Sequence, residues 1–170
     1  GLEVTRALAT AKANVIIAAY NLDHGDAVAK NVSAATGNPN VSAEQIDLSS
    51  FASVRQFVKG LTAKYPSIHL LVNDAGIDAN PLSLPPITTD GFERVFQVNY
   101  LGPFLLTELL WSTLAKSSSS LPMGSRVVNM ASGASYQNCD LANRPKDCLS
   151  TMSDWQLVAT TEALPKTVNG

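Results

Sequence analysis

The sequence predicts an α/β fold, in which helices cover both faces of one mostly parallel sheet. Two observations predict this class. Four short runs of aliphatic and β-branched residues have the nearly continuous apolar character of buried strands, and stretches with helical spacing lie between them. Strands that alternate with helices pair in parallel through right-handed crossovers. The four runs are residues 15–19, 41–46, 69–73 and 126–130.

A helix is expected after the second strand, which is itself the weakest of the four because polar residues interrupt it. Apolar residues recur there at i, i+3, i+6, i+7 and i+10, so that they share one face of a helix. Ser49 or Ser50 can cap its first turn. The apolar positions are Phe51, Val54, Phe57, Val58 and Leu61.

A second helix is expected to begin at Asp90. The carboxylate of Asp90 can accept from first-turn amides, and Glu93 three residues later completes a pattern like the capping box. The face of this helix is marked by Phe92, Val95, Phe96, Asn99, Pro103, Leu106 and Leu110. No regular helix can form through Pro103, because proline has no amide hydrogen to donate to the carbonyl of Asn99.

Composition restricts the function classes. The chain has 170 residues, of which 45% are apolar and 15% charged, as expected for a single globular domain. A net charge of −2 lacks the basic surface that nucleic acids require. Every apolar run is far shorter than the roughly 20 residues of a membrane span. Cys139 and Cys148 have no histidines at ligand spacing, so we expect neither a metal site nor a disulfide framework. We therefore expect the protein to lie in a reducing compartment, the cytoplasm.

Ligands of open α/β sheets bind beyond the carboxyl ends of the strands, and polar or small residues follow three of the predicted strands. Asp47 and Leu48 come after the second strand, where the carboxylate can accept from a ligand or cap the next helix. The third strand ends in residues 73–76, whose small Ala75 and Gly76 either let a ligand approach the backbone or form a simple turn.

Two further polar residues are candidates for chemistry. An amide at Asn99, in the middle of an apolar stripe, must find hydrogen-bond partners or cost about 1–3 kcal/mol. Its carbonyl, which Pro103 leaves free, can bind water, although a kinked helix with a satisfied asparagine explains the pattern equally well. Ser132 follows the fourth strand at the same edge of the sheet, where serine is also a common turn residue.

Together these motifs resemble the short-chain dehydrogenase/reductase family, in its retinol-dehydrogenase-like branch. The resemblance covers residues 1–136 and rests on the order and spacing of Asp47-Leu48, residues 73–76, Asn99 within residues 98–102, and Ser132. It implies a Rossmann-like doubly wound parallel sheet that binds a nicotinamide cofactor, NADP or NAD. It also implies hydride transfer between that cofactor and a small alcohol or carbonyl substrate.

The resemblance assigns the cofactor-binding roles. Asp47 and Leu48 would contact the adenine, and the segment that contains Asn73, Ala75 and Gly76 would support the sheet beside the cofactor. The main-chain carbonyl of Asn99 would hold a water molecule in a proton relay.

The resemblance gives Ser132 the role of polarising the substrate oxygen. The family's proton donor, a tyrosine followed four positions later by lysine, has no counterpart. Tyr136 is too close to Ser132, and position 140 is Asp140. We therefore expect a fragment that is inactive by itself. The alternative is a catalytically dead protein that kept the scaffold as a nucleotide sensor or interaction module.

Gly1 resembles the last glycine of the family's phosphate-binding loop, where a helix N-terminus favours an anionic group. The rest of that loop, the first strand and the C-terminal part of the fold are missing. The first strand would lie between the strands at residues 15–19 and 69–73. We expect one truncated dinucleotide-binding domain over residues 1–170, with a poorly defined tail at residues 136–170.

The choice between the two cofactors depends on the residues at the end of the first predicted strand. An acidic side chain there selects NAD, and a basic one accepts the extra phosphate of NADP. Residues 19–21 are Ala, Tyr and Asn. Because nothing at these positions repels the phosphate, NADP is slightly favoured. A homo-oligomer and membrane anchoring through a missing N-terminus both stay open.

Overall fold

The computed structural model describes residues 1–78, 85–119 and 124–131. The chain divides into two units, Gly1–Met130 and Ala131–Gly170, and all the described helices and strands lie in the first. Ser132 and the expected tail, residues 136–170, lie outside the described residues. The expectation of a single domain over residues 1–170 therefore stays a prediction.

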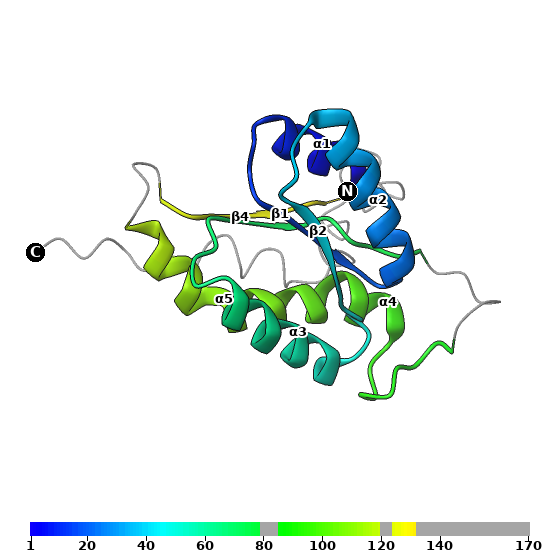
Figure 1. The fold of residues 1–170 in the computed structure, drawn as a ribbon. Coiled ribbons are helices and arrows are strands. Elements are labelled where there is room, and N and C mark those ends of the chain that lie inside the picture. Colours follow the sequence, from blue (N-terminus) through cyan, green and yellow to red (C-terminus); the bar gives the residue numbers. More distant parts are fainter. Residues whose placement is uncertain (79–84, 120–123, 132–170) are drawn as a thin grey trace, which may run out of the picture. The chain divides into compact units, whose positions relative to one another are not determined.

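Helices and strands alternate as predicted (Figure 1). The first strand has its predicted bounds, and each of the other three is one residue shorter than its predicted run. The order is α1 (Leu2–Thr10), β1 (Val15–Ala19), α2 (Leu22–Thr36), β2 (Val41–Gln45), α3 (Phe51–Lys64), β3 (Leu70–Asn73), α4 (Arg94–Phe96), the π-helical segment η1 (Gln97–Leu101), α5 (Gly102–Ser118) and β4 (Arg126–Asn129).

The four strands form two separate parallel pairs. In one pair β1 lies beside β2, with Val15 opposite Val41. In the other β3 lies beside β4, with Leu70 opposite Arg126. This division is expected of a Rossmann-like sheet that lacks its first strand, and it confirms the predicted fold class, an incomplete Rossmann-like α/β domain.

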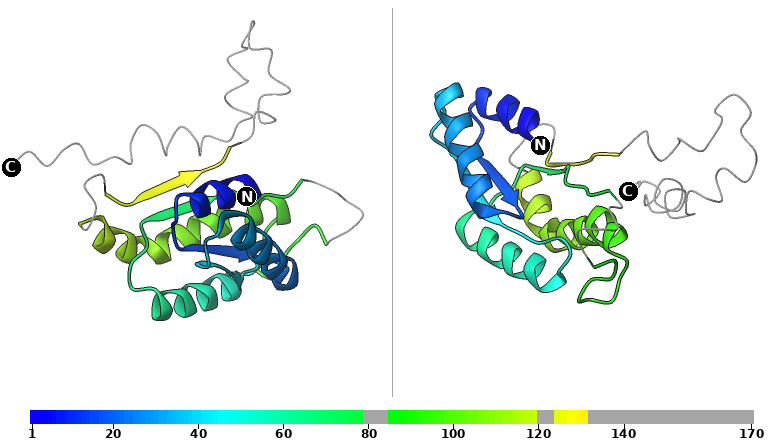
Figure 2. Two further views of the ribbon diagram at one scale, coloured as in Figure 1. Left: turned by 45° about the horizontal axis from the view of Figure 1, so that its top comes forward. Right: turned by 90° about the vertical axis from the view of Figure 1, so that its right-hand side faces the viewer.

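One helical layer joins the two strand pairs. Helices α3 and α5 lie side by side (Figure 2), and their buried side chains form the larger core cluster. Ile16 of β1, Leu71 of β3 and Val127 of β4 pack against this cluster, so both pairs share one core. Each fully buried aliphatic side chain contributes about 1.5–3 kcal/mol. The helical members are Val54, Phe57, Val58, Leu61, Leu106, Leu110 and Leu114.

The opposite face of the first pair is covered by α1 and α2. Val15 packs there with Ala9 and Val32 in a second core cluster. The second pair has no such cover among the described residues, because Val128 of β4 and Met130 are 40% and 56% exposed. In the described part of the chain, no helix is long and apolar enough to cross a membrane.

The predicted start of the second helix is wrong. The helix begins at Arg94, and its N-cap is Glu93, whose carboxylate accepts from the amides of Val95 at 2.9 Å and Phe96 at 2.6 Å. Asp90 instead accepts from the amide of Phe51, 2.8 Å away at the start of α3. The capping-box spacing could not distinguish this long-range partner from a local one.

Candidate functional site

The predicted break before Pro103 is present as a widened helical turn. Residues Gln97–Leu101 form a π-helical segment, and the amide of Gly102 donates to the carbonyl of Gln97, five residues back. Pro103 then lies in the first turn of α5, a position that suits its fixed φ, and it has no amide hydrogen to donate to the carbonyl of Asn99. The chain therefore accommodates the proline by shifting the hydrogen-bond ladder at Asn99.

Gly102 lets this turn approach the loop after β2. A Cβ atom at Gly102 would lie 2.6 Å from the carbonyl oxygen of Leu48 and 3.0 Å from its Cβ. Real Cβ atoms essentially never come so close to a backbone atom. The absence of a side chain therefore places Leu48, a predicted site residue, directly against the start of α5.

Asn99 meets the loop after β3. Its side-chain oxygen accepts from the amide of Ile77 at 2.8 Å, and its side-chain nitrogen donates to the carbonyl of the same residue at 2.9 Å. A Cβ at Gly76 would lie 3.5 Å from the Asn99 oxygen. The sequence predicted that this amide needs partners, and Ile77 supplies both. Asn99 is exposed rather than buried among the described residues.

Asn99 is exposed because the aromatic residues around it lie on the outside of the helix. Phe96, Tyr100 and Phe104 stack in sequence along the outside, with ring centroids 5.3 Å and 6.4 Å apart. Phe96 and Phe104 are 39% and 56% exposed. The stripe predicted as a core face therefore divides: Leu106 and Leu110 are buried, whereas the aromatic residues before them are not.

Asn73 connects three elements at the end of β3. Its side-chain nitrogen donates to the hydroxyl of Thr107 in α5 at 3.1 Å and to the side-chain oxygen of Asn129 in β4 at 2.8 Å. The amide of Met130 donates to its carbonyl at 2.9 Å. From Asn129 the chain continues to the predicted catalytic Ser132, whose position lies outside the described residues. The sequence analysis missed Thr107, whose hydroxyl holds the Asn73 side chain.

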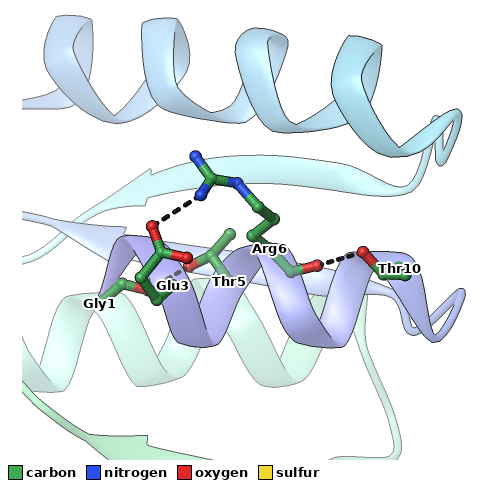
Figure 3. A network of polar contacts seen from close by, with 5 residues as sticks. All are labelled: Gly1, Glu3, Thr5, Arg6 and Thr10. Carbon is green, nitrogen blue, oxygen red and sulfur yellow. Dashed lines mark hydrogen bonds and ion pairs between the residues drawn. The ribbon is translucent and has the colours of Figure 1, made fainter.

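The N-terminus of α1 lies at the same loop. A Cβ atom at Gly1, the residue before α1, would lie 3.2 Å from the carboxylate of Asp74. Within α1, the carbonyl of Gly1 accepts from the amide and hydroxyl of Thr5, and Glu3 pairs with Arg6 at 2.7 Å (Figure 3). The predicted phosphate-binding end and the loop after β3 are therefore neighbours.

A pocket of about 490 Å³ opens at the carboxyl ends of β1 and β2. Only Asp47 of its lining was predicted as a site residue. The rule that ligands bind beyond the carboxyl ends of strands could have found the others, because they flank the ends of β1 and β2. The lining residues are Tyr20, Asn21, Leu22, Asp23, Gln45 and Asp47.

Asp47 has a local structural role as well as a place in the pocket. Its Oδ1 accepts from the amide of Ser49 at 2.8 Å and from the hydroxyl of Ser49 at 2.7 Å. The cap of α3 is Ser50, which accepts from the amide of Ser53. Asp47 thus holds the turn before α3 rather than capping it. Its Oδ2 makes no bond to a described residue and is available to a ligand.

A buried network anchors the turn that carries Asn99. Gln97 is fully buried, donates to the carboxylate of Asp90 at 2.7 Å, and accepts from the hydroxyl of Thr88. Asp90 also accepts from the amide of Phe51 at 2.8 Å. Sequence reasoning missed Gln97, although a polar residue next to an apolar stripe is the same signal that singled out Asn99.

The electrostatics at the start of α4 favour an ionised carboxylate. Hydrogen bonds from the backbone amides of Phe96 and Val95 lower the pKa of Glu93 below its ordinary value, because they stabilise the charged form. Within residues 1–78, 85–119 and 124–131, no group of three histidine, cysteine or acidic side chains could hold a metal ion.

Known proteins resemble this chain over most of its length. The model of the short chain dehydrogenase family matches residues 1–142. Retinol dehydrogenase 11 of Homo sapiens is 40% identical over 136 residues, which are 80% of this chain and 40% of that protein. Polyprenol dehydrogenase of Danio rerio is also 40% identical over 136 residues, 80% of this chain and 41% of that protein. The chain thus spans about two fifths of these curated relatives.

Solved structures agree on the fold. A RhlG/NADP active-site complex from Pseudomonas aeruginosa is 26% identical, with a TM-score of 0.65 over 94% of this chain and 63% of that chain. A 3-ketoacyl-(acyl-carrier-protein) reductase from Brucella melitensis, complexed with NADH, is 23% identical, with a TM-score of 0.65 over 96% and 64% of the two chains. The second likeness concerns the fold alone.

Proposed function

The chain belongs to the short-chain dehydrogenase family, and from this premise we propose that it is part of an NAD(P)-dependent oxidoreductase acting on an alcohol or carbonyl substrate. The observation that carries the proposal is the contact between Asn99 and the loop after β3, made through both polar groups of Ile77. Asn73 ties the same loop to the end of β4. Loops from successive parallel strands therefore converge at one edge, where ligands bind in open α/β sheets.

The residues at this edge fit a dinucleotide. Asp47 keeps one carboxylate oxygen for the adenine amino group and lines the pocket beyond β1 and β2, and Leu48 would contact the same ring. The start of α1 at Gly1 offers a helix N-terminus to the pyrophosphate. Ala75 and Gly76 carry little or no side chain and would face the nicotinamide half.

The bound nicotinamide would supply the hydride, and the chain's own residues would orient the reactants and conduct the proton. The two bonds from Asn99 to Ile77 fix the π-helical turn, so that the Asn99 carbonyl can hold a water molecule. Ser132 would orient the substrate oxygen, a role that rests on its place in the family motif, three residues after Asn129.

We also propose that these 170 residues have no turnover by themselves. No tyrosine with a lysine four positions later follows Ser132, so a general acid for the substrate oxygen is missing. The alternative function, a nucleotide sensor or interaction module without catalysis, is favoured by the same observation. The flanking coding sequence separates the two: an upstream glycine-rich loop and a downstream Tyr-x-x-x-Lys pair mark an active enzyme, whereas stop codons at both ends mark lost chemistry.

The cellular location and the oligomeric state of the protein stay predictions. A cytoplasmic location agrees with the cysteine content, and a homo-oligomer agrees with the exposed aromatic stripe of Phe96, Tyr100 and Phe104. Sedimentation velocity of the purified chain at several concentrations measures the oligomeric state directly. A monomer at every concentration would contradict the homo-oligomer.

The test of the proposed function combines binding and turnover. NADH and NADPH are titrated into the chain and followed by nicotinamide fluorescence, and hydride transfer is then measured with a panel of ketones and aldehydes. We expect saturable binding and no turnover. The variant Gly76→Val, which adds bulk beside Asn99, should weaken binding, whereas the surface variant Ala52→Val on α3 should not. Absence of binding would refute the nucleotide site, and robust turnover would refute the need for the missing tyrosine.

A further inference from the structure

The segment after β2 and the π-helical segment η1 are joined at two places. At the first, Gly102 lies against the segment after β2, where its added Cβ would be 2.6 Å from the carbonyl oxygen of Leu48. At the second, the carboxylate of Asp90 lies between the two segments. Its Oδ2 accepts from the amide of Phe51 at 2.8 Å and from the side-chain nitrogen of Gln97 at 2.7 Å. A single oxygen atom thus connects the start of α3 to the start of η1.

Both donors to Asp90 need this partner. The amide of Phe51 is one of the first four of α3, which have no acceptor within their own helix, and a carboxylate is favourable at a helix N-terminus. The side chain of Gln97 is fully buried, so its nitrogen is costly to leave unbonded. The oxygen of the same side chain accepts from the hydroxyl of Thr88, which is also buried. Asp90 therefore cannot move without unpairing donors on both segments.

The turn that contains Asp90 is itself held closed. The amide of Thr88 donates to the carbonyl of Phe92 at 2.9 Å, and the amide of Gly91 donates to the carbonyl of Thr88 at 3.0 Å. The ring of Phe92 packs against that of Phe51, with the centroids 5.6 Å apart. Residues 88–92 thus form a compact connection between the start of α3 and η1, with Asp90 at its centre.

We propose that Asp90 is a positioning residue, through which a nucleotide bound at the segment after β2 orders the turn that carries Asn99. The inference rests on the proposed function, because it needs the adenine end of a dinucleotide to contact Asp47 and Leu48. A bound adenine restrains these residues, and Asp90 extends the restraint to η1. The side chain of Asn99 is then held more firmly against Ile77, and its carbonyl keeps a fixed place for the water of the proton path. The cofactor thereby orders the proton path before the substrate binds.

Hydrogen exchange at Ile77 reports the order of this turn, because its amide donates to the side chain of Asn99. Coupled sites in proteins change one another's equilibria by about 5–150-fold. Two hydrogen bonds and one backbone contact form a short connection, so we expect an effect at the lower end of that range. A ligand that restrains the turn makes its opening rarer. The turn is closed most of the time with or without the ligand, so loss of the coupling changes the affinity little.

The test uses adenosine monophosphate, which has the adenine end of the cofactor alone and does not depend on turnover. Exchange at Ile77 is measured by NMR in the 170-residue chain, free and saturated with this ligand. Saturation should slow exchange about fivefold in the unmodified chain. In Asp90→Ala the ligand should still bind within about threefold of normal, and the ratio of free to bound exchange rates should fall to about one.

Two variants serve as controls. Asp26→Ala removes the same charge from an exposed position on α2 and should keep the full ratio. Asp90→Asn retains an oxygen that can accept from both Phe51 and Gln97, and should keep most of it. Circular dichroism checks that each variant is folded. If Asp90→Ala does not fold, Gln97→Leu replaces it, because this change breaks the bond to η1, keeps the bond to Phe51, and should also abolish the ratio.

A purely structural role for Asp90 gives a different result. Exchange at Ile77 in Asp90→Ala would then be faster by the same factor in the free and bound states, with the ratio unchanged. That outcome, or a bound ligand that does not slow Ile77 in the unmodified chain, would overturn the inference and leave the nucleotide site intact. If adenosine monophosphate does not bind, the inference fails, and the NADH titration decides separately whether the proposed function fails too.

Discussion

Replacing Gly102 by alanine tests whether the close contact between α5 and the loop after β2 is required. The new Cβ would lie 2.6 Å from the carbonyl oxygen of Leu48, which is a backbone atom and cannot move aside by changing a rotamer. Helix propensity favours alanine over glycine by about 0.5–1 kcal/mol, but forcing an extra carbon into packed surroundings costs about 1–3 kcal/mol or more. We expect the steric cost to dominate.

The expected result is a net loss of about 2 kcal/mol in the free energy of unfolding. For a chain of this size, about 2–4 °C of melting temperature corresponds to 1 kcal/mol, so Gly102→Ala should melt about 4–8 °C lower. Differential scanning calorimetry measures the shift. Displacement of Leu48 should also weaken ADP-ribose binding in the pocket next to it.

The chain contains a matched control for this substitution. Gly60 lies inside α3, and nothing approaches within 4 Å of its added Cβ among the described residues. Gly60→Ala should therefore stabilise the chain by about 0.5–1 kcal/mol through propensity alone. If Gly102→Ala proves as stable as Gly60→Ala, the reasoning from close contact is wrong.

Three further predictions concern the turn around Asn99. Asn99→Ala removes the acceptor of the Ile77 amide. Because a hydrogen bond of this kind contributes about 1 kcal/mol, its loss should speed hydrogen exchange at Ile77 about fivefold. Asn99→Asp keeps an acceptor oxygen and should leave that exchange rate unchanged. Gln97→Leu leaves Asp90 without its buried donor and should lower the free energy of urea unfolding by about 1–3 kcal/mol. Folding lowers the pKa of Glu93. The contribution of Glu93 to stability is therefore present above its ordinary pKa of 4.5 and is lost as the pH falls through the folded pKa. Between pH 6 and pH 3 the melting temperature of Glu93→Gln should therefore fall less than that of the unmodified chain.

Each of these three predictions can be contradicted by its own measurement. Unchanged exchange at Ile77 in Asn99→Ala would mean that another group protects that amide. A Gln97→Leu protein with normal stability would show that the buried network carries little energy. Parallel acid denaturation of the Glu93→Gln variant and the unmodified chain would show that the cap does not respond to pH.

Local patterns predicted most of the fold. The apolar runs predicted all four strands because buried parallel strands need side chains that tolerate burial on both faces, and the spacing after Ser50 predicted α3. The helix start at Asp90 was wrong for a physical reason. Its carboxylate accepts from the amide of Phe51, 39 positions away, and from the side chain of Gln97, rather than from amides of a first turn of its own. The order of residues in the sequence does not show which donors the Asp90 carboxylate binds.

The sequence predicted only those site residues whose position in the pattern of strands and helices is distinctive. Asn99 was found because an amide among apolar residues must be satisfied, but its partner, Ile77, has no distinguishing chemistry in the sequence. Asp23 and the other pocket residues after β1 were missed although they follow the strand end directly, where the strand-end rule could have found them. Ser132 lies outside the described residues, so its role stays a prediction.

The widened turn at Gln97–Leu101 has a consequence for how this region tolerates insertions and deletions. A turn closed by a bond between residues five apart holds one residue more than a regular α-helical turn. Deleting one residue from Gln97–Leu101 would therefore restore regular geometry and leave Leu106, Leu110 and Leu114 facing α3. A deletion within α5 itself has no extra residue to absorb it, and would rotate the residues that follow by about 100°. We therefore expect a one-residue deletion to destabilise the chain less in this turn than in α5.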